Sequence, residues 1–178
     1  DGLPADPAEI QGDIADLPTR QKLTGPWRMP IEAIWYHLDH KSLEKVVIIP
    51  SADDDRAMKG TFRDFEQFRA LVRRITARAA SHLDVRAVHE LLSDDEFRNG
   101  VDFENGEALL TATSKVWSAL EASGYRARDI LIDITGGQKV TGIAGAGVAL
   151  HDGRVFEYVS TRDYRVRTFD FIYERAPD

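Results

Sequence analysis

The chain has 178 residues and a mass of 20.0 kDa, and 43% of its residues are apolar, which suits one compact domain with one core. It carries 30 acidic and 23 basic residues, for a formal net charge of −7. This charge disfavours nonspecific binding to a long nucleic-acid backbone, which needs a strongly basic surface. A small anionic ligand is still compatible, because a few bases and helix ends can form a local positive site. The absence of cysteine excludes disulfides, thiolate nucleophiles and cysteine zinc motifs.

Residues 1–30 hold five of the seven prolines and few periodic apolar positions. This composition predicts a linker or a surface-wrapping arm over residues 1–29. Pro30 can open a helix without loss, because the first N–H groups of a helix have no partner. We therefore expect a short packing helix from Pro30 to Leu38 and a folded domain over residues 30–178.

From Val46 onward, short β-branched runs alternate with longer amphipathic segments, which is typical of βαβ units around a parallel sheet. The run Val46–Ile49 is apolar throughout and predicts a strand covered on both faces. We predict an α/β fold, Rossmann-like and three-layered, with a mainly parallel sheet and a C-terminal antiparallel hairpin. Further strands are expected at residues 84–91, 130–134, 155–159 and 166–173, and helices at 61–79, 105–124 and 138–150. Thr61 is expected to cap the first of these helices, Asn105 to introduce the second and Gly124 to end it.

Right-handed crossovers with the strand order 2-1-3 place the first strand beside the third. The loops after these two strands, residues 51–59 and 133–139, are then expected to face each other at the switch point, where open α/β sheets bind ligands. Arg162 lies in the turn after the fourth strand, and we expect it at the same edge, within reach of a phosphate.

The segment Asp133–Lys139 joins a buried strand to a helix and carries the most distinctive chemistry of the chain. Gly136 and Gly137 permit backbone angles and close approaches that other residues resist, and the following helix presents unpaired N–H groups. Thr135 adds a hydroxyl donor and Lys139 adds a positive charge. Together they predict a site for a phosphate or for nucleotide hydroxyls, although a tight turn with a capping threonine also fits. Neither a P-loop spacing nor a G-x-G-x-x-G fingerprint is present.

The pattern Asp-x-Thr-x-x-x-Lys, formed by Asp133, Thr135 and Lys139, resembles the second ligand motif of the CRISPR-associated Rossmann fold (CARF) family. Ser51, which follows the first apolar strand, resembles the first motif of that family. The likeness in element order spans residues 44–174. Many members of the family carry threonine where this chain has Gln138, whose amide also donates hydrogen bonds.

The resemblance implies a homodimeric sensor that binds a cyclic oligoadenylate across its two-fold axis. A ring of four adenylates has the matching symmetry and is the preferred ligand, and a ring of six also fits. No cofactor is expected. The expected ligand-binding residues are Ser51, Ala52, Asp133, Thr135, Gly136, Gly137, Gln138, Lys139 and Arg162.

The resemblance further implies that ligand binding activates an attached effector in type III CRISPR antiviral defence. No apolar run in the chain reaches the roughly 20 residues that cross a bilayer, and no signal-peptide pattern is present. We therefore expect a cytoplasmic domain of a bacterium or archaeon. The effector is expected before Asp1, with a helix anchored in the inner membrane as the first expectation.

Two other functions fit the same sequence. A ring nuclease would cleave the same ligand without metal, using Lys139 or Thr135 to orient a ribose 2′-hydroxyl. A stand-alone transcriptional regulator is disfavoured, because no helix-turn-helix and no basic patch is visible. A metal site is not expected, because Asp53–Asp55 form a solvated loop and the five histidines lack ligand spacing.

Two surface features have structural explanations as well as functional ones. The small residues of the helix after the motif, at positions 142 and 144–147, indicate close packing on the sheet or against a partner subunit. The arginines of the first long helix are expected on a solvated face; they stand at positions 63, 69, 73, 74 and 78.

Overall fold

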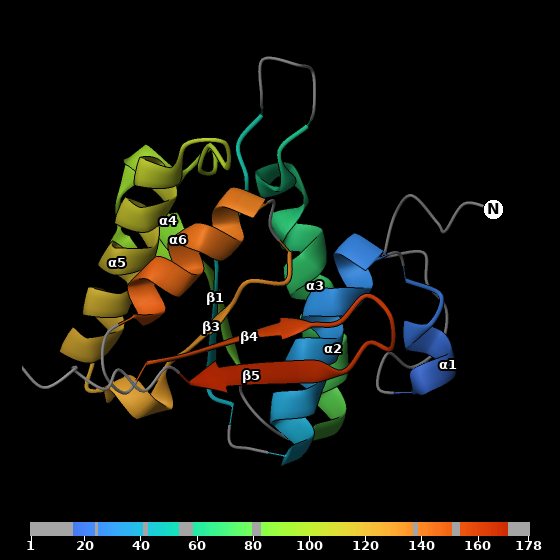
Figure 1. Ribbon diagram of the computed structural model, residues 1–178. Helices are drawn as coiled ribbons and strands as arrows, with labels where there is room; N and C mark the ends of the chain where they lie inside the picture. The colour runs from blue at the N-terminus through green and yellow to red at the C-terminus, as the bar shows by residue number, and fades with distance from the viewer. Residues whose placement is uncertain are drawn as a thin grey trace, which may run out of the picture.

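The computed structural model describes residues 16–23, 25–40, 43–53, 59–79, 83–136, 139–150 and 154–170. Over these residues the protein is a mixed α/β structure with two small sheets flanked by helices (Figure 1). The first sheet pairs β1 (Lys45–Ile48) with β2 (Asp84–Ala87) in parallel. The second contains β3 (Leu131–Asp133), β4 (Val155–Val159) and β5 (Val166–Asp170), with β3 parallel and β5 antiparallel to β4. The predicted parallel pairing of the first two strands and the C-terminal antiparallel hairpin are therefore confirmed.

The expected strand order 2-1-3 within one continuous sheet is not found. In the described part of the chain, β1 pairs only with β2, and β3 pairs only with β4. β3 is only three residues long, and all three are in register with β4: Leu131 with Val155, Ile132 with Phe156 and Asp133 with Glu157. The regular ladder of β3 is thus made on its β4 side.

The helices lie on both sides of β1. α2 (Gly25–His40) and α3 (Phe65–Ala79) lie on one side, and α4 (Val88–Leu92), α5 (Gly106–Ala122) and α6 (Lys139–Ala149) lie on the other (Figure 1). A short α1 (Leu17–Arg20) precedes α2, and 3₁₀ turns occur at Thr61–Asp64, Asp95–Phe97 and Ala127–Asp129.

The alternation of side chains along a strand explains how β1 serves two cores. Val46 and Ile48 pack against the cluster formed by α2 and α3, whereas Val47 and Ile49 pack against the cluster formed by α4, α5 and α6. Both faces of this strand are therefore covered by apolar side chains, as its uniform composition predicts.

Helix α2 begins at Gly25, before Pro30, which lies inside the helix. Pro30 lacks the N–H that would bond the preceding turn, and the apolar face around it offsets this loss, because Ile31 is fully buried. Leu23 is buried in the same core, and Arg20 on α1 bonds Glu32 at 3.1 Å. Residues 16–23, which we assigned to the arm, thus pack against α2.

Two further element boundaries differ from the predictions. β2 ends at Ala87 instead of residue 91, because helix α4 begins directly after it. The Glu90 carboxylate stabilises this helix start: it accepts the Ala87 N–H and two hydrogen bonds from Arg69. Thr61 does not cap α3; its hydroxyl group bonds Ser51 instead. By contrast, Asn105 caps α5 through its side chain, as predicted.

Candidate functional site

At the end of β1, Ser51 and Thr61 hold each other. The Ser51 N–H donates to Thr61 Oγ1 at 2.9 Å, and the Thr61 N–H donates to Ser51 Oγ at 3.1 Å. The two hydroxyl oxygens are 3.2 Å apart and share one hydrogen bond. Because each hydroxyl has one hydrogen and only one is used between them, the other is left to donate to a ligand oxygen. Thr61 thereby joins Ser51 as a candidate ligand residue.

The backbone of Ser51 and Ala52 is enclosed by two glycines. A Cβ on Gly60 would lie 2.3 Å from the Ala52 carbonyl carbon, and a Cβ on Gly100 would lie 2.5 Å from the Ser51 oxygen. Gly100 also has a φ of 83°, which disfavours any side chain. Val101 completes the contact, because its carbonyl accepts the Ala52 N–H at 2.8 Å. The N–H groups of Ser51 and Ala52 are thus both used within the protein.

At the end of β3, Asp133 and Thr135 form a closed turn. Asp133 Oδ1 accepts the Thr135 N–H at 2.8 Å and the Thr135 hydroxyl hydrogen. The Thr135 oxygen in turn accepts the Val159 N–H at 2.6 Å. In this arrangement the Thr135 hydroxyl has no hydrogen left for a ligand, so its first role is to fix the turn against β4.

The pKa of Asp133 is raised to about 6. The residue as a whole is exposed to solvent, but neighbouring protein atoms crowd its carboxyl group, and the resulting loss of hydration favours the neutral form. The hydrogen bonds from Thr135 oppose the rise, the negative charge of Glu157 adds to it, and His37 opposes it. The carboxyl at the centre of the turn therefore changes charge close to neutral pH.

A buried hydrogen-bonded pair lies behind this turn. His37 Nε2 is 2.8 Å from both carboxylate oxygens of Glu157, and because a carboxylate only accepts, this nitrogen carries the hydrogen. Glu157 is 1% exposed and His37 is 8% exposed. The pair joins α2 to β4 and places a second carboxylate in register with Asp133.

Lys139 begins α6, as predicted, and is exposed. Gly136 is also exposed, with no atom within 4 Å of the Cβ it lacks. Gly137 and Gln138, two of the predicted ligand residues, lie outside the described residues. Further along α6, a Cβ on Gly145 would lie 2.4 Å from Ile134 Cγ2, so the expected close packing on the sheet is confirmed at this glycine.

Arg162 lies in the turn between β4 and β5, next to the strand end that holds Thr135. Its backbone N–H donates to Ser160 Oγ at 3.3 Å, and the residue is exposed. Tyr164, in the same turn, has its ring 3.4 Å from the guanidinium carbon of Arg28 on α2. The Arg162 guanidinium has no recorded partner in the described part of the chain.

The structure brings some of the predicted residues near one another. β1 runs upward and β3 runs upward and to the right in Figure 1, so the turns that follow these two strands both lie toward the upper part of the molecule, where α6 begins. The Val159–Thr135 bond ties the end of β4, which precedes the Arg162 turn, to the turn after β3. The described residues record no direct contact between Ser51 and Thr135.

Three other charged residues considered from the sequence, Asp53, Arg63 and Arg69, have local partners. Asp53 accepts the Gly60 N–H at 2.8 Å and pairs with Arg63, and these contacts, led by the Arg63 hydrogen bond, lower its pKa to about 2. Arg69 is not on a solvated face; it bonds Glu90 at 2.5 Å with little of its side chain exposed. Among the described residues, no group of three or more His, Cys, Asp or Glu side chains is arranged to hold a metal ion.

The described helices include none that combines the length and the apolar character needed to cross a membrane.

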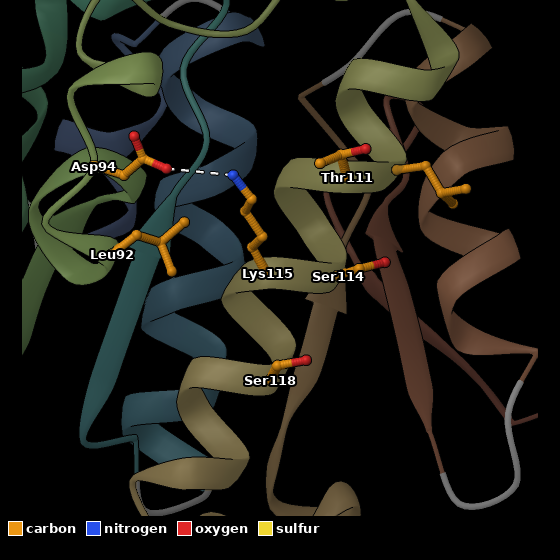
Figure 2. Close-up of a pocket in the computed structure, with 7 residues that line it drawn as sticks. Leu92, Asp94, Thr111, Ser114, Lys115 and Ser118 are labelled. Carbon is orange, nitrogen blue, oxygen red and sulfur yellow. Dashed lines mark hydrogen bonds and ion pairs between the residues drawn. The ribbon is translucent and has the colours of Figure 1, made fainter.

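A separate open recess of about 560 Å³ lies along α5 (Figure 2). Lys115 reaches from α5 to Asp94 at 3.3 Å and to Glu96 at 3.0 Å, so its charge is already neutralised. Thr111, Ser114 and Ser118 line the helix beside it. None of the predicted ligand residues borders this recess, and we do not assign it to the site.

Sequence reasoning missed the glycines that enclose Ser51, the hydroxyl partner Thr61 and the His37–Glu157 pair. The sequence contains a signal for some of these residues, because Gly60 directly precedes Thr61 and Gly100 follows a polar loop. No sequence pattern links His37 to Glu157, which are 120 positions apart. Only the fold brings these two residues together.

No family model matches the chain, and no solved structure matches it significantly. The chain is similar to an uncharacterized protein of Aquifex aeolicus (strain VF5), with 31% identity over 160 residues. The aligned region is 90% of this chain but 45% of the relative, so the chain spans less than half of that protein's length.

Proposed function

We propose that this chain is a CARF-type sensor domain that binds a cyclic oligoadenylate, preferably a ring of four, across the two-fold axis of a homodimer. The finer assignment to a Rossmann-like three-layer fold belongs to the same proposal. It is supported by the helices on both sides of β1 and by the parallel pairs β1–β2 and β3–β4.

One observation carries the proposal: the closed Asp133–Thr135 turn leads from β3 to the N-terminus of α6, where Lys139 is exposed. The unpaired N–H groups of a helix N-terminus and an adjacent lysine favour a phosphate. The spare hydroxyl hydrogen of the Ser51–Thr61 pair, at the same end of the molecule, suits a ribose or phosphate oxygen.

The charge of Asp133 fits an anionic ligand of this kind. An ionised carboxylate in the turn would repel a phosphate, whereas the pKa of about 6 allows Asp133 to take up a proton at little cost when an anion binds. Arg162 adds an exposed positive charge at the neighbouring turn. A ring of phosphates therefore meets donors and cations contributed by three strand ends.

The proposed homodimer has a surface available on α6. Ile143 is 73% exposed, and Gly142 beside it has open space where a side chain would be. Leu110 on α5 is exposed too. A second copy of the chain would cover this apolar surface next to the proposed ligand site, and a four-membered or six-membered ring would match its two-fold symmetry.

A ring nuclease is the second candidate, favoured by the same carboxyl. The pKa of Asp133 is about 6, which suits a general base that removes the proton from a ribose 2′-hydroxyl. The 2′-oxygen would attack the adjacent phosphorus and expel the 5′-oxygen, which takes up a proton. The products would be a 2′,3′-cyclic phosphate and a 5′-hydroxyl end, with Lys139 or Thr135 positioning the ribose.

The test is calorimetric titration of the purified chain with cyclic tetra-adenylate and cyclic hexa-adenylate, followed by chromatography of the mixture. Binding with a stoichiometry of one ring per two chains is expected, and Lys139→Glu should abolish it. Arg128→Glu is the matched control, because Arg128 is exposed before the opposite end of β3 and the charge change is the same. Equal loss in both variants would remove Lys139 from the site. Linear products would replace the sensor by the nuclease.

The proposed output is activation of an effector in the full-length protein during type III CRISPR antiviral defence, with a membrane-anchored effector as the first candidate. More than half of the Aquifex relative lies outside the aligned region, which is compatible with a further domain in that protein.

A further inference from the structure

Strand β4 bonds the ligand turn on one side and α2 on the other. The Glu157 carbonyl accepts the Ile134 N–H at 2.9 Å, and two residues later the Val159 N–H donates to Thr135 Oγ1. The Glu157 side chain extends toward α2 and bonds His37 there. One residue of β4 therefore contacts both the start of the turn and the helix.

The burial of this link makes it rigid. Because Glu157 and His37 are both nearly inaccessible, water cannot replace their hydrogen bonds. A shift of Glu157 must either carry His37 with it or leave a buried carboxylate unpaired, and the second outcome is strongly unfavourable. A change in the turn after β3 is therefore expected to move α2.

The link continues to α1. Arg28 on α2 stacks on Tyr164 in the β4–β5 turn and bonds Glu32 at 3.2 Å. Glu32 is 8% exposed and also binds Arg20 of α1, which is 6% exposed. Together with helix α2 itself, these contacts link the turn after β3 to the β4–β5 turn and to α1.

We propose that α2 is the output element of the domain, coupled to the turn after β3 through the Glu157–His37 pair. The identity of the ligand in this inference rests on the proposed function, whereas the coupling between the turn and the helix does not. Spatial continuity alone does not prove coupling, so the test must perturb one end and read the other.

The first arm needs no ligand. Thr135→Val removes the hydroxyl bonds to Asp133 and Val159, and hydrogen–deuterium exchange of the whole chain then reads α2. We expect amide exchange in residues 31–40 to rise by at least about five-fold, with α5 unchanged as the internal control. In a background of His37→Leu with Glu157→Leu, which replaces the pair by apolar side chains, the same Thr135→Val change should leave α2 unaffected. An equal response of α2 in both backgrounds would overturn the proposal.

A second readout avoids any change to the pair. The side-chain nitrogen resonances of His37 in the otherwise unaltered chain should shift with Thr135→Val, and a stationary His37 signal would contradict the coupling even if the doubly substituted background does not fold.

The second arm adds cyclic tetra-adenylate to the wild-type chain. Protection of α2 together with a His37 shift supports both the ligand and the output helix. Binding with a silent α2 and a silent His37 overturns the coupling and leaves the ligand assignment intact. No binding, with the Thr135→Val response present, overturns the ligand assignment and leaves the coupling intact.

Discussion

The buried pair of His37 and Glu157 gives the most direct stability prediction. His37→Ala leaves Glu157, which is 1% exposed, as a carboxylate without its partner. Leaving a buried carboxylate without its hydrogen-bond partner costs about 3–5 kcal/mol, and burial on both sides means that no solvent screening reduces this value. Since a domain of this kind has about 5–15 kcal/mol of unfolding free energy in total, the loss is a large share of it.

Urea denaturation followed by circular dichroism measures this effect in a double-mutant cycle. The single variants His37→Leu and Glu157→Leu should each be strongly destabilised, whereas the double variant that combines these two changes should recover most of the stability, because no buried charge is left unpaired. His40→Ala is the matched control. His40 lies on the same helix, but more than half of its side chain is exposed, so its change should stay within about 0.5 kcal/mol.

Additive losses in the cycle would refute this reasoning. If the double variant loses the sum of the two single losses, the side chains contribute through independent packing and not through their mutual bond. A loss for His37→Ala as small as that for His40→Ala would show that the Glu157 carboxylate finds another partner.

Three further predictions concern the turns and α6. Gly100→Ala should lower the unfolding free energy by more than the about 1–2 kcal/mol expected for Gly124→Ala, because both have positive φ but only Gly100 also meets backbone atoms; equal losses in urea titrations would count against the close approach. Gly145→Ala should lower the unfolding free energy by about 1–3 kcal/mol, because the new methyl group would lie 2.4 Å from Ile134 Cγ2. Gly142→Ala, in open space on the same helix, should raise it by about 1 kcal/mol. Shifts of the same sign for both variants in thermal melts would contradict this packing. Asp133 binds its proton more tightly in the folded state (pKa about 6) than in the unfolded chain (3.8), so the stability of the wild-type chain should fall as the pH rises from about 4 to 6. Asp133→Asn should reduce this pH dependence of the urea midpoint. An unchanged pH dependence would show that another group causes it.

The features predicted correctly from the sequence depend on local chemistry. Asn105 caps α5 because its side chain bonds the N–H groups of the next turn, and Gly124 ends the helix with a φ of 96°. The run Val46–Ile49 predicts a covered strand because four consecutive apolar residues cannot leave one face to water. In each case the deciding contacts lie within a few residues.

The features that were predicted wrongly depend on distant partners. The apolar pattern of residues 84–91 predicts a strand to residue 91, but β2 ends at Ala87. Arg69, on a distant helix, bonds Glu90, and Glu90 in turn bonds the Ala87 N–H, which favours the start of α4 at this point. Thr61 fits a helix cap by its spacing, but Ser51 competes for its hydroxyl. For the same reason the site could be predicted at the ends of two strands, whereas the buried His37 behind it could not.

The contacts that join residues 51–53 to residues 60–63 have a practical consequence. Ser51 bonds Thr61, and Asp53 bonds both Gly60 and Arg63, so two successive cross-links hold these two stretches of the chain side by side. A segment closed in this way tolerates insertions, because the entropy of loop closure grows only slowly with length. The stretch between the cross-links is therefore the natural position at which to graft new recognition sequences, leaving β1 and α3 undisturbed.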